Sequence, residues 1–427
     1  MKTLRTIGIA VVAMTLTGGT AGAVGRQTGG TTNGITASEI KLAYPDIDFA
    51  KLKDVGVKID RGDAQKIFDA LTDQLNAEGG IKGRKVHVEV VKYDLLNPAD
   101  AESACVKMTE DLKVFGVLNG FDGPVQSVTK CITDHKTLLV GGSPEVATAT
   151  KTPWISGPPS QDRAARVFVE LMAKKGLFKG KTIGISTDPA QEQTTKKVIV
   201  PALKKAGYTP KVVVVDDGPP GDTAAADANW DVFAEKFKSA GVDHVILVGA
   251  ETSGGLTRLL DRGVKATVSS PTNGQVESLG TSQTQRPASD YDGYYTWTGL
   301  TPDQIFADPG MHKCVQTFEK ANPSITVKKP SAVAEGDTDW ATGILTACGQ
   351  LGLFTTVAER VGKNLNNQSF IDTVEGMTAN FVSPGGQYNT FGPKKFDATN
   401  GFRLGVFDHT MGKTGGVKPL GSLQNLP

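Results

Sequence analysis

The chain has 427 residues, enough for two domains at about 100 to 200 residues each. Its 39% hydrophobic and 21% charged residues are typical of globular proteins, which excludes wholesale disorder and a polytopic membrane protein. With 46 basic and 45 acidic side chains the formal net charge is +1, so no extended field favours nucleic acid or an anionic membrane surface.

The N-terminus has the pattern of an export signal. The basic start MKTLR precedes an apolar run from Ile7 to Leu16, and residues 21–23 (AGA) fit the small-x-small rule for signal-peptidase cleavage. We expect residues 1–23 to be a signal peptide and 24–35 a flexible leader, with an uncleaved anchor as the alternative. No cysteine precedes Cys105, so we expect a periplasmic or extracellular protein that is not lipid-anchored through a lipobox cysteine.

The first strong helix pattern ends in a glycine-rich turn. DAQKIFDALTDQLNAEGG places apolar residues at helical spacing, with Gly79 as the stop, and KVHVEV alternates as a strand does. A nucleotide-binding glycine loop follows a strand and opens a helix. EGGIKGR runs from helix to strand with the wrong glycine spacing, so we interpret it as a turn, with Lys82 and Arg84 as solvated flanks.

Strand and helix patterns then alternate twice over. A first series runs from the strand at Ile40 to Ala43 through VFGVL to TLLVG, with helices between. A second series follows Trp154, with the strands KTIGIS, KVVVV, HVILVG and ATVSS separated by helices. Beyond these we expect a strand at GYYTW, three helices within 311–376 and a last strand at 402–407. The order predicts an α/β fold with two doubly wound, mostly parallel sheets.

Four cysteines are present, an even number in a chain with an export signal. Cys105 and Cys131 fall on consecutive predicted helices, and Cys314 and Cys348 fall on two of the late helices. We therefore predict two disulfides, Cys105–Cys131 and Cys314–Cys348.

No catalytic constellation is recognisable in the sequence. KKGLFKGKT has one residue too few for a Walker A loop, no GxSxG elbow occurs, and the five histidines lack the close pairs of a metal site. The acid pair Asp216-Asp217 has no nucleophile or base to work with. We expect no catalytic residue, no metal and no cofactor.

The stretch LNAEGGIKGRKV before a strand resembles the N-terminal hallmark of type I periplasmic solute-binding proteins, the branched-chain amino acid receptor family of ABC transporters. The resemblance extends over YPDID, NPADAESACVKMTEDLKVFGVL, LLVGGSP, WISGPPS, DHVILVGAETSGGLTRLLDRG and DGYYTW. It implies two lobes joined by a three-strand hinge, which we place at residues 36–158 plus 292–382 and at 159–291 plus 383–427.

The resemblance also implies a function. Such a protein is a monomer that captures a small polar or amphipathic molecule between its lobes. It delivers this molecule by hinge closure to an ABC permease, which is its only membrane contact. It is not an enzyme and needs no cofactor. Two alternatives remain: a binding protein that senses ligand for a receptor, and an exported enzyme that uses the cleft.

The family's ligand site is carried over to loops that follow strands. The first lobe would supply Tyr44, Asp46, Phe121, Asp122, Gly142 and Ser143, and the second lobe Asp188, Gln191, Glu251, Thr272 and Asn273. Amino-acid binders commonly have an aromatic-glycine step where this chain has Pro189-Ala190, and an acid near its Thr272-Asn273. The acid that holds an amine would therefore be Glu251 or Asp122, or the ligand has no amine.

Overall fold

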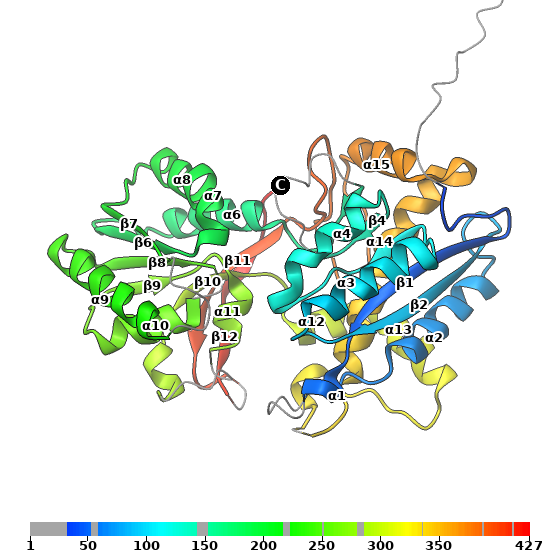
Figure 1. The fold of residues 1–427 in the computed structure, drawn as a ribbon, viewed down its shortest axis with the longest axis horizontal. Helices are drawn as coiled ribbons and strands as arrows, with labels where there is room; N and C mark the ends of the chain where they lie inside the picture. The colour runs from blue at the N-terminus through cyan, green and yellow to red at the C-terminus, as the bar shows by residue number, and fades with distance from the viewer. Residues whose placement is uncertain are drawn as a thin grey trace, which may run out of the picture.

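Two sheets, each covered by helices, form the computed structural model of the chain (Figure 1). The structure describes residues 32–52, 59–142, 153–216, 223–249, 252–279, 286–334, 336–386, 388–411 and 414–427. The predicted signal peptide, most of the predicted leader, Ser143 and Glu251 lie outside these ranges. The predicted α/β fold with two mostly parallel sheets is confirmed.

The first sheet and the hydrophobic core packed on it form what we call the N-terminal lobe. Its five strands are all parallel, in the order β2-β1-β3-β4-β5. They are β1 (Glu39–Ile47), β2 (Lys85–Tyr93), β3 (Gly116–Leu118), β4 (Leu138–Val140) and β5 (Trp154–Ile155). Val86 and Val88 of β2 are buried while Lys85 and His87 are exposed, as the alternating sequence predicts.

Helices from both ends of the chain cover this sheet. The early ones are α1 (Phe49–Leu52), α2 (Ala64–Ala77), α3 (Pro98–Val106) and α4 (Thr129–Asp134); the late ones are α12 (Pro302–Phe306), α13 (Pro309–Ala321), α14 (Trp340–Val361) and α15 (Asn367–Gly376). Among the described residues, one segment, Trp340–Asn364, is long and apolar enough to span a membrane. More than half of its most apolar window is buried, because α14 is a core helix of this lobe.

The turn EGGIKGR joins α2 to β2, as predicted. Gly80 has a φ of +62°, and a Cβ atom there would lie 2.1 Å from the Arg84 carbonyl oxygen, so the turn requires glycine. The expectation that Arg84 is solvated was wrong. Its Nε donates to the Thr36 carbonyl at 3.0 Å and its Nη2 to the Lys363 carbonyl at 2.9 Å. Arg84 thus ties the turn to the entry of β1 and the segment after α14.

The second sheet and its two cores form the C-terminal lobe, with strand order β12-β11-β10-β9-β8-β6-β7. The strands are β6 (Ile183–Thr187), β7 (Val212–Val215), β8 (His244–Val248), β9 (Thr267–Ser269), β10 (Tyr295–Thr298), β11 (Gly401–Asp408) and β12 (Gly416–Asn425). Its helices are α6 (Gln161–Lys174), α7 (Glu192–Thr194), α8 (Val200–Lys205), α9 (Thr223–Ser239), α10 (Thr252–Asp261) and α11 (Asn273–Glu277). Val245 and Leu247 of β8 face one core while Ile246 and Val248 face the other, so helices cover both faces of this sheet.

The structure corrects the predicted lobe boundaries at two places. Strand β10, expected in the N-terminal lobe, pairs with β9 and β11 of the second sheet. Phe391, Phe396 and Ala398, expected in the C-terminal lobe, pack in the core of the first. The chain therefore leaves the C-terminal lobe after Thr298 and returns to it near Asn400.

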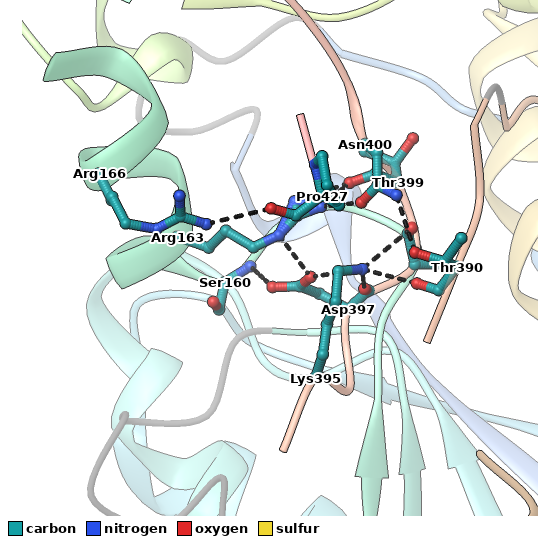
Figure 2. Close-up of polar contacts among 10 residues, drawn as sticks. Ser160, Arg163, Arg166, Thr390, Lys395, Asp397, Thr399, Asn400 and Pro427 are labelled. Carbon is teal, nitrogen blue, oxygen red and sulfur yellow. Dashed lines mark hydrogen bonds and ion pairs between the residues drawn. The ribbon is translucent and has the colours of Figure 1, made fainter. Parts of the chain in front are cut away.

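Three crossing segments, residues 156–160, 299–301 and 398–400, join the lobes, in line with the predicted three-strand hinge. The first and third lie side by side: Ser156 N donates to the Phe396 carbonyl at 2.9 Å, and Ala398 N donates to the Ser156 carbonyl at 2.8 Å. Figure 2 shows the polar contacts at this junction. Arg163 Nε of α6 lies 3.1 Å from Asp397 Oδ1, and Ser160 N donates to Asp397 Oδ2 at 2.7 Å.

Both predicted disulfides are confirmed. Cys105 is bonded to Cys131, between α3 and α4, and Cys314 is bonded to Cys348, between α13 and α14. Each bond links two helices of the N-terminal lobe.

Candidate functional site

A cavity of about 450 Å³ lies at the carboxyl ends of β1 and β3 in the N-terminal lobe. Its walls are the end of β1, helix α1, residues 59–62 and the first turns of α2 and α14. The lining residues are Tyr44, Pro45, Asp46, Ile47, Phe49, Leu52, Ile59, Arg61, Gly62, Ala64, Ile67, Phe68, Leu95, Asn119, Asp122, Gly343, Thr346 and Ala347. This is the edge at which open α/β sheets bind ligands, and the volume is typical of small-molecule sites.

Aromatic side chains fix the floor of the cavity. The Tyr44 ring packs on Phe68 with centroids 4.9 Å apart, and Tyr93 packs on Phe121 at the same separation. The Tyr93 hydroxyl accepts a hydrogen bond from the backbone N–H of Asp122 at 3.1 Å, which holds the loop after β3. Phe121 is only 2% exposed, so it supports this loop from below and does not line the cavity.

The polar side of the cavity combines one cation with two carboxyl groups and a phenol. Burial raises the pKa of Asp46 to about 6, although Lys92 opposes the shift. The Asp122 side chain is accessible from the cavity. The surrounding protein nevertheless displaces solvent and raises the pKa of Asp122, whereas the positive charge of Arg61 lowers it. Burial, then Asp46 and Asp122, also raise the pKa of Tyr44, so its hydroxyl stays neutral and can donate or accept a hydrogen bond.

The structure brings only some of the predicted site residues to the cavity. Tyr44, Asp46 and Asp122 line the cavity. Gly142 follows β4 with a φ of +65° and packs against Gly120 outside the lining. Ser143 and Glu251 lie outside the described residues, so nothing is said of their positions.

The remaining predicted residues follow strands of the C-terminal lobe. Asp188 Oδ1 accepts a hydrogen bond from the backbone N–H of Gln191 at 2.7 Å. A Cβ atom at Gly249 would lie 1.9 Å from Asp188 Oδ2, so this close approach requires glycine. Thr272 and Asn273 open α11, just beyond β9. None of these four predicted residues lines the cavity, whose described lining belongs wholly to the N-terminal lobe.

Sequence reasoning missed several lining residues. Arg61 lies just before the Asp63 cap of α2, in a stretch that also contains Lys51, Lys53 and Lys58, so the sequence did not single it out. Asn119 follows β3 directly and was passed over in favour of the next residues. Thr346 reaches the cavity from α14, more than 200 residues along the chain, and no local pattern reveals that contact.

Two clusters of described residues bring potential metal-ligating atoms close together. In both clusters these atoms are engaged in other bonds. Cys105 and Cys131 beside His135 are joined in a disulfide. In the exposed cluster of Asp292, Asp408 and His409, the His409 Nδ1 lies 2.6 Å from Asp292 Oδ2. Asp408 accepts hydrogen bonds from Thr410.

Replacing Asp46 with asparagine is expected to stabilise the protein at pH 7.5 by about 1 kcal/mol and to have little effect at pH 4. The pKa of Asp46 rises from 3.8 to about 6 on folding. A raised folded pKa favours the native state below pH 4, and this advantage disappears as the pH rises through 6. The full shift corresponds to about 3 kcal/mol, which partial exposure reduces. Urea denaturation at both pH values measures the difference.

Asp73→Asn, on the exposed face of α2, is the control for the loss of one carboxylate at an exposed position. An Asp46→Asn effect that does not depend on pH would contradict the prediction.

The comparisons with known proteins agree with this architecture. A family model described as periplasmic binding protein matches residues 62–410. A periplasmic binding protein type 1 from Bordetella pertussis Tohama I is 14% identical with a TM-score of 0.59, covering 90% of this chain and 100% of its own. A leucine-, isoleucine-, valine-, threonine- and alanine-binding protein from Brucella ovis, in a closed conformation, is 14% identical with a TM-score of 0.60, covering 91% and 96%. A fatty acid ABC transporter substrate-binding protein from Thermomonospora curvata is 15% identical with a TM-score of 0.57, covering 92% and 94%.

At these identities the solved structures show a shared fold. No curated protein sequence matches the chain. The family model covers most of the 427 residues, from the start of α2 to the end of β11. The chain therefore belongs to the periplasmic binding protein family.

Proposed function

We propose that this protein is the extracytoplasmic substrate-binding component of an ABC transporter. It binds a small polar or amphipathic molecule between its lobes and passes it to the permease without chemical change. The observation that carries the proposal is the cavity at the carboxyl edge of the first sheet, in a lobe joined to a second α/β lobe by three crossing segments.

The proposed mechanism is closure about the crossing segments. The described lining of the cavity comes from one lobe, so a ligand seated there leaves its other side for the second lobe. Asp188, Gln191, Thr272 and Asn273 follow strands of that lobe and are our candidates to complete the site. A ligand that contacts both lobes stabilises the closed form, because only that form makes both sets of contacts.

Family membership supports a location outside the cytoplasm. The export signal expected in residues 1–23 and the two disulfides fit an oxidising compartment. We propose a monomer that reaches the membrane through its permease. The names of its structural neighbours include binders of aliphatic amino acids and of fatty acids, which sets the range of ligands to be screened.

A thermal-shift screen of the mature protein over amino acids, amides, aromatic acids, sugars and fatty acids is the first test. At least one compound should raise the melting temperature and, in solution scattering, reduce the radius of gyration. A compound that binds tightly but leaves the radius of gyration unchanged would argue against hinge closure. Chemical turnover of the bound compound would replace the transport proposal with an enzymatic one.

A further inference from the structure

Much of the cavity lining is apolar. Ile47, Phe49, Leu52, Ile59 and Phe68 all contribute to it. The cavity volume of about 450 Å³ lies within the range of small-molecule sites. Most of the cavity surface favours an apolar ligand body.

Arg61 is the one basic residue among the described residues that line the cavity. Its guanidinium lies 6.0 Å from the centroid of the Phe49 ring. It makes no hydrogen bond or ion pair with any other described residue. No described residue takes up its donors, although its charge lowers the pKa of Asp122 across the cavity. The planar guanidinium matches a carboxylate with two parallel hydrogen bonds.

Packing on α14 fixes the backbone that carries Arg61. Gly62 has a φ of +77°, and a Cβ atom there would lie 2.4 Å from the Trp340 ring. The Asp60 carbonyl accepts a hydrogen bond from Asp339 N at 2.7 Å, and Asp60 Oδ2 accepts one from Thr338 Oγ1 at 3.0 Å. The Arg61 backbone is thus held in place before any ligand arrives, which lowers the entropy lost on binding.

We infer that the ligand is an amphipathic monocarboxylate whose carboxylate pairs with Arg61 and whose apolar chain lies between Phe49 and Phe68. The inferred ligand carries no amine; an amine paired with Asp46 or Asp122 is the competing arrangement, which leucine tests below. This inference rests on the proposed function and narrows it to one class of ligand. Asp46 and Asp122 oppose any negative charge in this cavity, so a ligand carboxylate is expected only where it pairs with Arg61, and a dicarboxylate is disfavoured.

Isothermal titration of the mature protein with octanoate, decanoate, methyl decanoate, decanol and leucine tests the inference. Decanoate should bind about tenfold more tightly than octanoate, because it buries two further methylene groups. Methyl decanoate and decanol should bind about 10- to 100-fold more weakly than decanoate, because they lack the charge that Arg61 recognises.

Arg61→Gln should weaken decanoate binding about 10- to 100-fold and leave methyl decanoate unchanged. Arg61→Lys should restore part of the loss. Lys66→Gln is the matched control, since it removes one positive charge from an exposed position of α2 and should leave decanoate binding unchanged. The melting temperature of each variant verifies that it folds.

Equal binding of decanoate to the wild-type protein and Arg61→Gln would overturn the inference. If leucine binds with closure while octanoate and decanoate do not bind, the inference is overturned and the proposed function stands. No binding by any of these compounds overturns the inference, and no binding across the wider screen overturns the proposed function.

Discussion

Replacing Asp397 with alanine is expected to lower the free energy of unfolding by about 3 to 5 kcal/mol. Arg163 and Asp397 have side chains only 8% and 4% exposed, and they lie 3.1 Å apart at the junction of the crossing segments. Arg163 Nη1 also donates to the Thr399 carbonyl at 2.8 Å, and Lys395 Nζ donates to the Thr390 carbonyl at 2.6 Å (Figure 2). Removing the carboxylate leaves two partly buried cations without their counter-ion, and that accounts for the size of the loss.

Urea denaturation monitored by circular dichroism measures this change. Arg166→Gln is the matched control: Arg166 lies one turn along α6 and pairs with Glu170 at 3.1 Å, with both side chains about 40% exposed. It should cost less than about 1 kcal/mol, as exposed ion pairs do. The double variant Arg163→Met/Asp397→Leu should recover part of the loss, because it removes both buried charges. A loss below about 1 kcal/mol for Asp397→Ala would show that the pair does not hold the junction.

Local sequence patterns predicted most elements of both sheets. The alternation of Val86 and Val88 with Lys85 and His87 marked β2, because one face of that strand is solvated. Strand β12 was not predicted. Its sequence, GVKPLGSLQN, contains Pro419 and Gly421 and does not alternate between apolar and polar residues, and an exposed edge strand tolerates both features. The place of β10 was also missed, because strand pairing across about 100 residues is set by tertiary packing with β11.

The same difference between local pattern and tertiary packing separates the site residues that the sequence predicted from those that it did not. Tyr44 and Asp46 lie in the carboxyl-terminal half of β1 and Asp122 in the loop after β3, at the edge where a parallel sheet places its ligands, so chain order alone identified them. Thr346 enters the cavity from α14, and the Arg61 backbone is positioned by packing of its neighbour on Trp340. Those contacts depend on how the late helices return to the first lobe, which the periodicity of a single segment does not specify.

Replacing both disulfides with alanine pairs is expected to destabilise the N-terminal lobe by about 7 kcal/mol. Each bond contributes about half of this loss. Cys105 and Cys131 are separated by 26 residues, and Cys314 and Cys348 by 34. Each cross-link restricts an unfolded loop of that length, which corresponds to about 3 to 4 kcal/mol on the chain-entropy estimate. Because 7 kcal/mol is comparable with the whole stability of many domains, the quadruple variant should bind no ligand at 37 °C.

Urea denaturation of each alanine pair measures the two contributions separately. A reductant should destabilise the wild-type protein to the same extent and leave the quadruple variant unchanged; a wild-type protein indifferent to reductant would contradict this assignment of its stability.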